Sequence, residues 1–198
     1  DEPIQVAGQP VERLSTMIGD MLFLAQADHS RIRLVPGGVD LPAEVRALFD
    51  YFEAWADDHH VGLVLEGEAV TASGDRQMLQ RALSNLISNA IRHTPSGQAV
   101  VVALRQDADR AIVDVSNPGP DIPAEHLPRL FDRFYRVDPA RQRKGEGAGL
   151  GLAIVKSIVE AHGGSVLVTS ERGRTRFSMT LPKYPVENSS GFLGRPTS

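Results

Sequence analysis

The stretch Gly145-Glu146-Gly147-Ala148-Gly149-Leu150-Gly151-Leu152 places four glycines at alternate positions, directly before an apolar segment that predicts a helix over residues 151–162. Backbone N–H groups at the start of a helix lack partners, and the helix dipole favours negative charge there, so such a loop predicts a phosphate site. The order of residues differs from that of a Walker A loop, and no predicted strand precedes it, which argues against a dinucleotide-binding fold. The remaining alternative is a flexible linker.

A second helix, predicted over residues 75–93, carries a polar row beside its apolar stripe. Asn85, Asn89 and Arg92 follow i, i+4, i+7 spacing. Asparagine is a middling helix former, so two of them one turn apart need a reason. An amide oxygen suits Mg²⁺, which usually shares phosphate ligands, and Arg92 would offset phosphate charge. A polar helix edge that faces solvent is the alternative.

A third feature follows a predicted strand, where Asn117 ends the strand and Gly119 lets the backbone approach a flat group. An ordinary turn is the alternative. Residues 129–144 hold six basic residues against two acids, although the whole chain has a net charge of −4. A local basic segment on an acidic protein indicates a small anionic ligand rather than nucleic acid.

Composition sets wider limits. The 198 residues predict one domain with an appendage, and 41% hydrophobic and 23% charged residues are typical of a globular protein. The absence of cysteine excludes disulfides and thiolate metal sites. No apolar run approaches the roughly 18 residues of a membrane span. Because the chain begins without Met, we expect it to be an excised piece of a larger protein.

The periodicity of apolar residues predicts an α+β fold. Helices are expected over residues 10–29, 42–59, 75–93 and 151–162, with a short one at 124–131, and residues 30–40 are expected to be a linker. Strands are expected at 62–65, 69–72, 100–105, 111–115, 166–170 and 175–181, in antiparallel pairs separated by helices. This order favours a two-layer sandwich with one sheet face covered by helices. The apolar stripe of the 10–29 helix either covers its own domain or seeks a partner helix.

Five motifs, in order, resemble the ATP-binding domain of sensor histidine kinases. These are residues 85–94 (N-box), Asn117-x-Gly119 (G1 box), Leu130-Phe131-Asp132-Arg133-Phe134 (F-box), Gly147-x-Gly149-x-Gly151-Leu152 (G2 box) and Gly173-Arg174-Thr175-Arg176-Phe177. The resemblance covers about residues 10–182. Residues 20–28 and 141–146 are most similar to the heavy-metal, copper-type branch. The family usually has Asp where Asn117 stands and Gly where Asp121 stands.

The Asn117 amide can still accept from the adenine amino group after choosing its orientation, but without the charge assistance of Asp, and its freedom to turn should weaken discrimination against GTP. Asn117→Asp is therefore expected to tighten ATP binding by about 1 kcal/mol. The alternative is that Asn117 only caps the turn before Pro118, with adenine contacted by water or by another residue such as Asp114.

The resemblance implies a Bergerat-type fold, with a mixed, mostly antiparallel sheet, and an N-terminal helix from a dimerisation hairpin. It implies three parts: residues 1–30 from that hairpin, 31–184 as the ATP-binding domain and 185–198 as a disordered tail. Asn89 would ligate Mg²⁺, supported by Asn85. The other residues expected to bind ATP are Arg92, His93, Arg141, Arg143 and Lys144 at the phosphates, Gly145, Gly147, Gly149, Leu150, Gly151 and Leu152 in the phosphate loop, Asn117, Gly119 and Thr175 near adenine, and Ile122, Phe134 and Tyr135.

The family's phospho-accepting box, a His followed by an acid, an apolar and a basic residue, is absent from this sequence. The expected activity is therefore transfer of the ATP γ-phosphoryl group to a His on a dimerisation helix outside the chain, with Asn85, Asn89 and Arg92 as catalytic residues. The implied partners are a response regulator and a second copy of the full-length protein. We expect the cytoplasmic portion of an inner-membrane sensor, with no nucleic acid bound and no membrane contact by this piece.

Two other classes stay open. One is a nucleotide-switched interaction module of the same fold. Water activation in such an ATPase would need a carboxylate on the N-box helix, where this sequence has Ser84, Asn85, Ser88 and Asn89. The other is a Ser/Thr protein kinase of the same fold, against which the helix over residues 10–29 argues.

Overall fold

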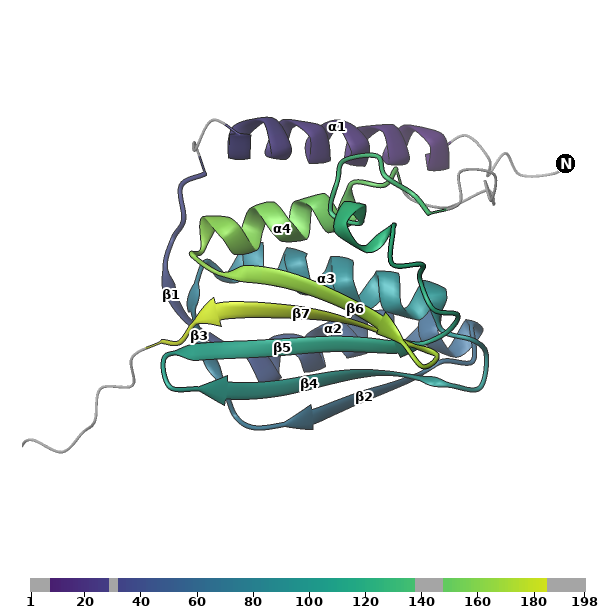
Figure 1. Cartoon of the computed structure of the whole chain (residues 1–198). Helices are drawn as coiled ribbons and strands as arrows, with labels where there is room; N and C mark the ends of the chain where they lie inside the picture. The colour runs from purple at the N-terminus through teal and green to yellow at the C-terminus, as the bar shows by residue number, and fades with distance from the viewer. Residues whose placement is uncertain (1–7, 29–31, 138–147, 185–198) are drawn as a thin grey trace, which may run out of the picture.

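The computed structural model describes residues 8–28, 32–137 and 148–184. The predicted tail, and residues 138–147 of the basic segment and the glycine loop, lie outside these ranges. The elements in chain order are α1 (Gly8–Asp28), β1 (Gly37–Asp40), α2 (Leu41–Asp58), β2 (Gly62–Gly67), β3 (Thr71–Gly74), α3 (Arg76–His93), β4 (Ala99–Asp107), β5 (Arg110–Pro118), the 3₁₀ helix η1 (Leu127–Arg129), α4 (Gly151–Ala161), β6 (Ser165–Glu171) and β7 (Arg174–Pro182) (Figure 1).

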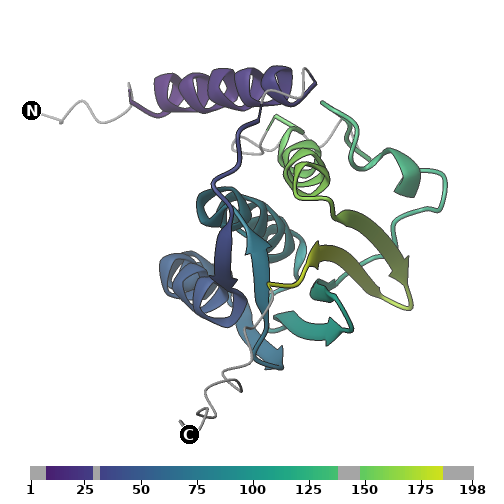
Figure 2. The ribbon, with the colours of Figure 1, turned by 90° about the vertical axis from the view of Figure 1, so that its left-hand side faces the viewer.

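The main sheet has five strands in the order β2-β4-β5-β7-β6, parallel between β2 and β4 and antiparallel elsewhere. Helices α2, α3 and α4 cover one face, and the other face is open (Figure 2). Alternate residues of β5, among them Val113 and Val115, are fully buried under the helices. The predicted two-layer α+β sandwich is therefore confirmed.

A second, two-stranded sheet pairs β1 with β3, in the register Gly37 opposite Gly74. The expectation of a linker over residues 30–40 is thus wrong for its second half, because glycines and Pro36 hide a strand that is only four residues long. The expected pairing of residues 62–65 with 69–72 is also wrong. The first strand pairs in parallel with β4, whereas the second pairs with β1.

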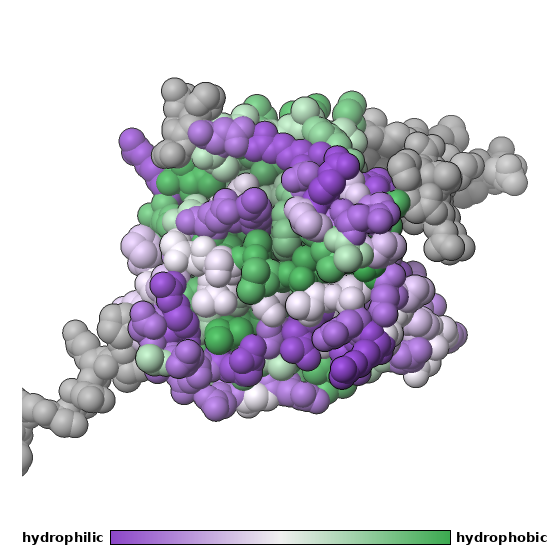
Figure 3. All heavy atoms as spheres, in the orientation of Figure 1, coloured by the Kyte–Doolittle hydropathy of each residue, from purple (hydrophilic) through white to green (hydrophobic). Residues whose placement is uncertain are grey.

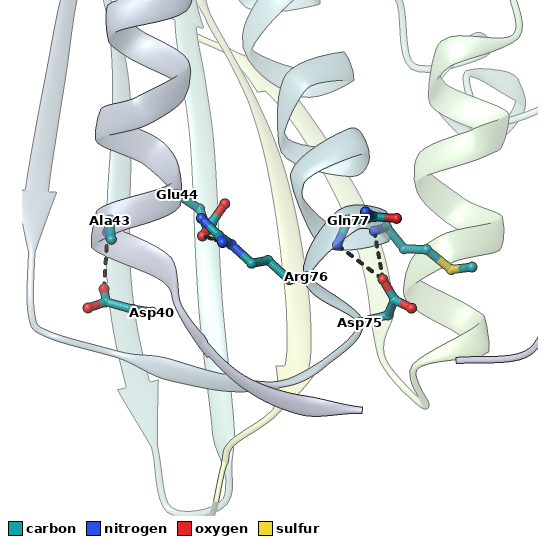
Figure 4. Close-up of polar contacts among 7 residues, drawn as sticks. Asp40, Ala43, Glu44, Asp75, Arg76 and Gln77 are labelled. Atoms are coloured by element: carbon teal, nitrogen blue, oxygen red, sulfur yellow. Dashed lines mark hydrogen bonds and ion pairs between the residues drawn. The ribbon is translucent and has the colours of Figure 1, made fainter. Parts of the chain in front are cut away.

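Side-chain carboxylates cap the N-termini of two of the helices that cover the sheet (Figure 4). The side chain of Asp40 accepts a hydrogen bond from the Ala43 amide at the start of α2, and Asp75 accepts from Gln77 and Met78 at the start of α3. Glu44 of α2 pairs with Arg76 of α3. These contacts fix where α3 begins, and hence the height of its polar row along the sheet.

Asp75 also joins the chain segment after α1 to α4. Its second oxygen accepts from the Val35 amide at 3.0 Å, and its own amide donates to Nε2 of buried His162 at 2.9 Å. His162 in turn bonds the Ile158 carbonyl through Nδ1. Burial raises the pKa of Asp75, but the bonds from the Val35, Met78 and Gln77 amides and the nearby His162 outweigh it, so the pKa is lowered overall.

Helix α1 packs beside α4 at the edge of the domain (Figure 1). Leu24 is 1% exposed, and Asp20 forms an ion pair with Arg81 of α3. The opposite side of α1 carries exposed Leu14, Ile18, Met21 and Leu22. Figure 3 shows hydrophobic groups along the upper edge of the molecule, where α1 lies. One side of α1 thus covers its own domain, and the other side is an exposed apolar stripe, for which a partner helix stays a prediction. No described helix is both long and apolar enough to cross a membrane.

The short helix expected over residues 124–131 is reduced to η1. The amides of His126, Arg129 and Leu130 bond carbonyls three residues earlier, in 3₁₀ geometry. Pro128 has no amide to donate. This segment leads into the F-box, where Phe131 packs edge-on against Phe177 of β7.

Candidate functional site

The polar row of α3 and the glycine loop meet where α3 packs against α4. A Cβ built on Gly151 would lie 3.3 Å from Oδ1 of Asn85, so the start of α4 touches the first asparagine of the row. Asn85 and Asn89 are half-buried, and neither side-chain amide bonds another residue in the described parts of the chain. Their oxygens are therefore available to a ligand.

The N-terminus of α4 is an anion-binding end. Its cap, Leu150, is buried and makes no side-chain hydrogen bond to the first-turn amides. These amides and the helix dipole point into the site beside Asn85. Gly151 and Leu152, both half-buried, form the first turn. The structure thus brings together Asn85, Gly149, Leu150, Gly151 and Leu152, as the sequence predicts.

The end of the F-box and the residues just before α4 lie next to each other. The Phe134 amide donates to the Gly149 carbonyl at 2.9 Å. Gly149 has φ +73°, and a Cβ there would lie 3.1 Å from the Phe134 backbone, so the position requires glycine. Phe134 itself has φ 61° and is 55% exposed. The five predicted site residues Arg141, Arg143, Lys144, Gly145 and Gly147 lie between these two points, outside the described residues.

Three cationic or ionisable groups gather at the C-terminal end of α3. Burial lowers the pKa of Arg92, and nearby Arg136 lowers it further. Burial likewise lowers the pKa of His93, with added repulsion from Arg92 and Arg136. Such mutual repulsion is relieved by a bound polyanion. Arg92 also lies 6.0 Å from the Trp55 ring centre.

Asn117 ends β5 on the helix-facing side of the sheet and is only 4% exposed. Its Nδ2 donates to the Pro118 carbonyl at 3.0 Å, which leaves Oδ1 as the free atom of the amide. Thr175 of β7 lies opposite it in the register and is also buried. The Thr175 hydroxyl bonds Ser170 of β6 at 2.8 Å. A polar row across three strands therefore forms one wall of the site.

Residues 117–122, here called the Asn117 loop, follow this row. Gly119 has φ +156°, and a Cβ there would lie 3.2 Å from the His93 carbonyl, so the loop packs against the end of α3. The Gly119 amide donates to the Gly173 carbonyl at 3.0 Å, and the Gly173 amide donates to Oδ1 of Asp121 at 2.8 Å. The Ile122 amide donates to Ser170.

Tyr135 is engaged elsewhere. Its hydroxyl bonds Nδ1 of His126, and Arg129 stacks 4.3 Å from its ring centre. The structure therefore places this predicted site residue at the base of the segment after the F-box, with its polar tip already paired.

The earlier possibility that Asp114 contacts adenine in place of Asn117 is ruled out by the sheet. Asp114 points to the open face, where Arg105 and Ser178 bond it. In Figure 3 this side of the molecule shows hydrophilic groups over its lower part and hydrophobic groups across its middle.

Sequence reasoning missed Arg136, Ser170 and Asp121. Arg136 had a usable signal, because it stands two residues after Phe134 in the basic segment. Ser170 had none, since its role depends on β6 pairing with β7. Asp121 was noticed only as a departure from the family pattern.

The donor set around Asn89 fits a Mg²⁺ ion that is shared with a ligand. No group of three or more His, Cys, Asp or Glu side chains that could hold a metal is present among the described residues. A single amide oxygen, completed by waters and phosphate oxygens, matches the ligands that Mg²⁺ prefers.

The family model described as histidine kinase-, DNA gyrase B- and HSP90-like ATPase matches residues 74–185, more than half of the chain. The sensor histidine kinase CusS of Escherichia coli K12 is 54% identical over 174 residues, which are 88% of this chain and 36% of CusS. The sensor protein CzcS of Cupriavidus metallidurans is 39% identical over 188 residues, 94% of this chain and 39% of CzcS. The chain thus spans little more than a third of these relatives.

Solved structures agree on the fold. Full-length ShkA in complex with AMPPNP has a TM-score of 0.77 at 26% identity, covering 87% of this chain and 36% of ShkA. The Acinetobacter baumannii histidine kinase AdeS has a TM-score of 0.78 at 24% identity, covering 93% of this chain and 88% of AdeS. ThkA in complex with the response regulator TrrA has a TM-score of 0.72 at 23% identity, covering 95% of this chain and 54% of that chain. The predicted resemblance to sensor histidine kinases, heavy-metal branch included, is confirmed.

Proposed function

This chain belongs to the histidine kinase-, DNA gyrase B- and HSP90-like ATPase family, and from that premise we propose that it transfers the γ-phosphoryl group of ATP to a histidine outside the chain, as the catalytic part of a sensor histidine kinase. The observation that carries the proposal is the contact between Gly151 at the start of α4 and Asn85 in the polar row of α3. It sets amide oxygens beside unpaired helix amides, the two kinds of group that a metal-bound triphosphate needs.

The phosphates lie against the first turn of α4, between Gly149 and Leu152. Arg92 and His93 face them from the end of α3, and Arg141, Arg143 and Lys144, outside the described residues, would contribute further positive charge. Phosphoryl transfer needs mainly positioning and neutralisation of charge, and these groups supply both. The attacking atom comes from the acceptor histidine, so no residue of this site has to be a nucleophile.

Asn89 supplies an oxygen ligand to Mg²⁺, and Asn85, held against Gly151, supports it. The bound ion would neutralise phosphate charge and orient the γ-phosphoryl group. Helix α3 carries no carboxylate and so offers no base for activating water. That absence favours transfer to a protein over simple ATP hydrolysis.

Adenine lies at the other end of the site. Oδ1 of Asn117 accepts a hydrogen bond from the exocyclic amino group, while Gly119, Ile122 and Thr175 shape the pocket around the ring. Phe134 and Tyr135, where the F-box ends, complete the proposed set of nucleotide contacts. This assignment rests on the buried, oriented amide of Asn117 and its neighbour Thr175.

In the full-length protein, residues 1–30 would form part of a dimerisation hairpin, residues 31–184 the ATP-binding domain and residues 185–198 a tail. The exposed Leu14, Ile18, Met21 and Leu22 support this division, because they offer an apolar stripe to a further helix. The phosphorylated histidine would then pass its group to a response regulator. The homologues are named as sensors, and we place this chain on the cytoplasmic side of a membrane protein.

The test uses the chain, γ-labelled ATP with Mg²⁺, and a separately produced hairpin that carries the histidine box of a CusS-type kinase. We expect acid-labile, alkali-stable label on the hairpin and none on the chain alone. Gly151→Ala should abolish the transfer, because its Cβ crowds Asn85. Gly37→Ala, at a glycine of β1 with open space around it and no positive φ, serves as a control for expression and handling. Acid-stable label on the chain would indicate a Ser/Thr kinase. Release of free phosphate without label on either protein would indicate an ATPase module.

A further inference from the structure

Three hydrogen bonds hold the Asn117 loop to the hairpin of β6 and β7 near its turn. Two of them use loop backbone amides: Gly119 donates to Gly173, and Ile122 donates to Ser170. The third uses a loop side chain, because Oδ1 of Asp121 accepts from the Gly173 amide at 2.8 Å. Gly173 therefore forms hydrogen bonds through both of its backbone groups: its carbonyl accepts from Gly119, and its amide donates to Asp121.

The position of Gly173 matters because the loop lies between two surfaces. On one side Gly119 is packed against the His93 carbonyl at the end of α3. On the other side Gly119 O lies 3.8 Å from where a Cβ of Gly173 would be. Gly173 has φ +72° in a two-residue turn beside Arg172, which also has positive φ, 55°. Such a turn has little freedom to follow the loop if the loop moves.

From this geometry we infer that Asp121 is a positioning residue for the base-binding end of the site, which it serves by holding the Gly173 amide. The inference rests on the proposed function, since it presumes that Asn117 and Gly119 contact the base. Asp121 stands where the resemblance leads one to expect glycine, which has no side chain to make this bond. A carboxylate oxygen accepting an amide N–H makes a charge-assisted bond, stronger than a neutral one.

The role requires an acceptor oxygen at this place, whereas the negative charge is secondary. Asn at position 121 can present the same oxygen to Gly173, whereas Ala cannot. The effect should be confined to the base. The amides of α4 and the asparagines of α3 lie at the other end of the site and keep their positions. Removal of the bond should thus lower the affinity for ATP and for ADP by the same factor and leave the affinity for a bare polyphosphate unchanged.

The experiment measures displacement of a fluorescent ATP analogue by ATP, ADP and Mg²⁺-tripolyphosphate from the wild-type chain and three variants. Asp121→Ala should weaken ATP and ADP alike by roughly three- to tenfold, the loss expected for one hydrogen bond. Asp121→Asn should restore at least half of that loss on a logarithmic scale. Glu171→Ala, which removes an acid from the same hairpin, is the control and should match wild type. Amide exchange at Gly173 should speed up in Asp121→Ala alone.

Outcomes separate the inference from its premise. If the wild-type chain does not bind ATP, the proposed function fails and the inference with it. If wild type binds ATP and Asp121→Ala binds it equally well, only the inference is overturned. It is also overturned if Asp121→Asn binds nucleotide as weakly as Asp121→Ala, or if Asp121→Ala loses affinity for tripolyphosphate as much as for ATP. An unchanged rate of amide exchange at Gly173 in Asp121→Ala would overturn it as well.

Discussion

The substitution Asn117→Asp restores the residue expected from the family pattern and tests how this amide binds adenine. In the structure Asn117 is 4% exposed, and its Nδ2 donates to the Pro118 carbonyl at 3.0 Å. A carboxylate has no donor for that carbonyl. When one Asp oxygen faces the base, the other therefore faces the Pro118 oxygen.

The opposing free energies are of similar size. A charged acceptor roughly doubles the bond to the adenine amino group, a gain on the order of 1 kcal/mol. Loss of the bond to Pro118 costs about 1 kcal/mol, and an unpaired buried polar group costs about 1–3 kcal/mol. The tightening by about 1 kcal/mol that the sequence alone suggests is thus offset. We expect ATP affinity to change by less than about threefold and the free energy of unfolding to fall by about 1–3 kcal/mol.

The same bond sets nucleotide preference. Guanine presents a carbonyl where adenine presents an amino group, so its binding would require the Asn117 amide to turn Nδ2 toward the base. That turn breaks the bond to Pro118 and places Oδ1 against its carbonyl, at a cost of about 1–3 kcal/mol, or roughly 5- to 150-fold in affinity. The wild-type chain should therefore prefer ATP to GTP. A freely turning amide, as considered from the sequence, would give a poorer preference.

Competition titrations of ATP and GTP against wild type, Asn117→Asp and Asn117→Ala, with denaturant unfolding of each, check this reasoning. Asn117→Ala should lose ATP affinity and most of the preference. The reasoning is refuted if Asn117→Asp binds ATP about tenfold tighter at unchanged stability, or if wild type binds GTP as well as ATP. The first result would mean that the hydrogen bond to Pro118 contributes no measurable free energy. The second would mean that the Asn117 amide turns freely.

Three further substitutions follow from the site and from α1. Asn89→Ala should remove most of the Mg²⁺ dependence of ATP binding in calorimetry, because the described residues form no cluster of three or more His, Cys, Asp or Glu that could hold the ion instead; a retained wild-type Mg²⁺ dependence would exclude Asn89 as the ligand. The lowered folded-state pKa of His93, due to burial, Arg92 and Arg136, means that its stability contribution is full above the unfolded pKa near 6.5 and is lost as pH falls through the lower folded value. His93→Gln should therefore lose less stability than wild type between about pH 7.5 and about pH 5.5 in denaturant titrations, with His60→Gln as the matched control; equal losses would argue against the shift. Leu24→Ala should cost about 2–4 kcal/mol and speed amide exchange in α1, whereas Leu22→Ala, 60% exposed on the same helix, should stay within about 0.5 kcal/mol; equal effects would mean that α1 does not pack as described.

The elements with strong periodicity were predictable from the sequence. The stripe of Leu79, Leu83 and Leu86 defines α3, and the apolar run after Gly151 defines α4, because burial against a sheet requires such patterns. The strand β1 was not predictable. Its four residues include two glycines, and its existence depends on pairing with β3 and on nothing local.

The site divides in the same way. Asn85, Asn89 and the glycine loop were found because each belongs to a local pattern with a chemical meaning. The bonds of Asp121 and Ser170 were not, because they join residues about 50 positions apart through strand pairing. The orientation of the Asn117 amide was not either, because the sequence does not say which of its two terminal atoms faces the Pro118 carbonyl. Asp114 shows the converse error: it is near Asn117 in sequence, but the alternation of a strand turns it to the opposite face.

The bond between Val35 and Asp75 has a mechanical consequence. Val35 lies on the segment that comes from α1, and Asp75 begins α3, the helix that carries Asn85 and Asn89. A helix is stiff along its axis, with a rise of about 1.5 Å per residue, so Asp75 and Asn89 are the two ends of a rod roughly 21 Å long. His162 fixes the near end of this rod to the far end of α4. A pull or twist arriving from α1 therefore acts on the start of that rod, and its displacement is delivered at the proposed metal ligand without any intervening loop.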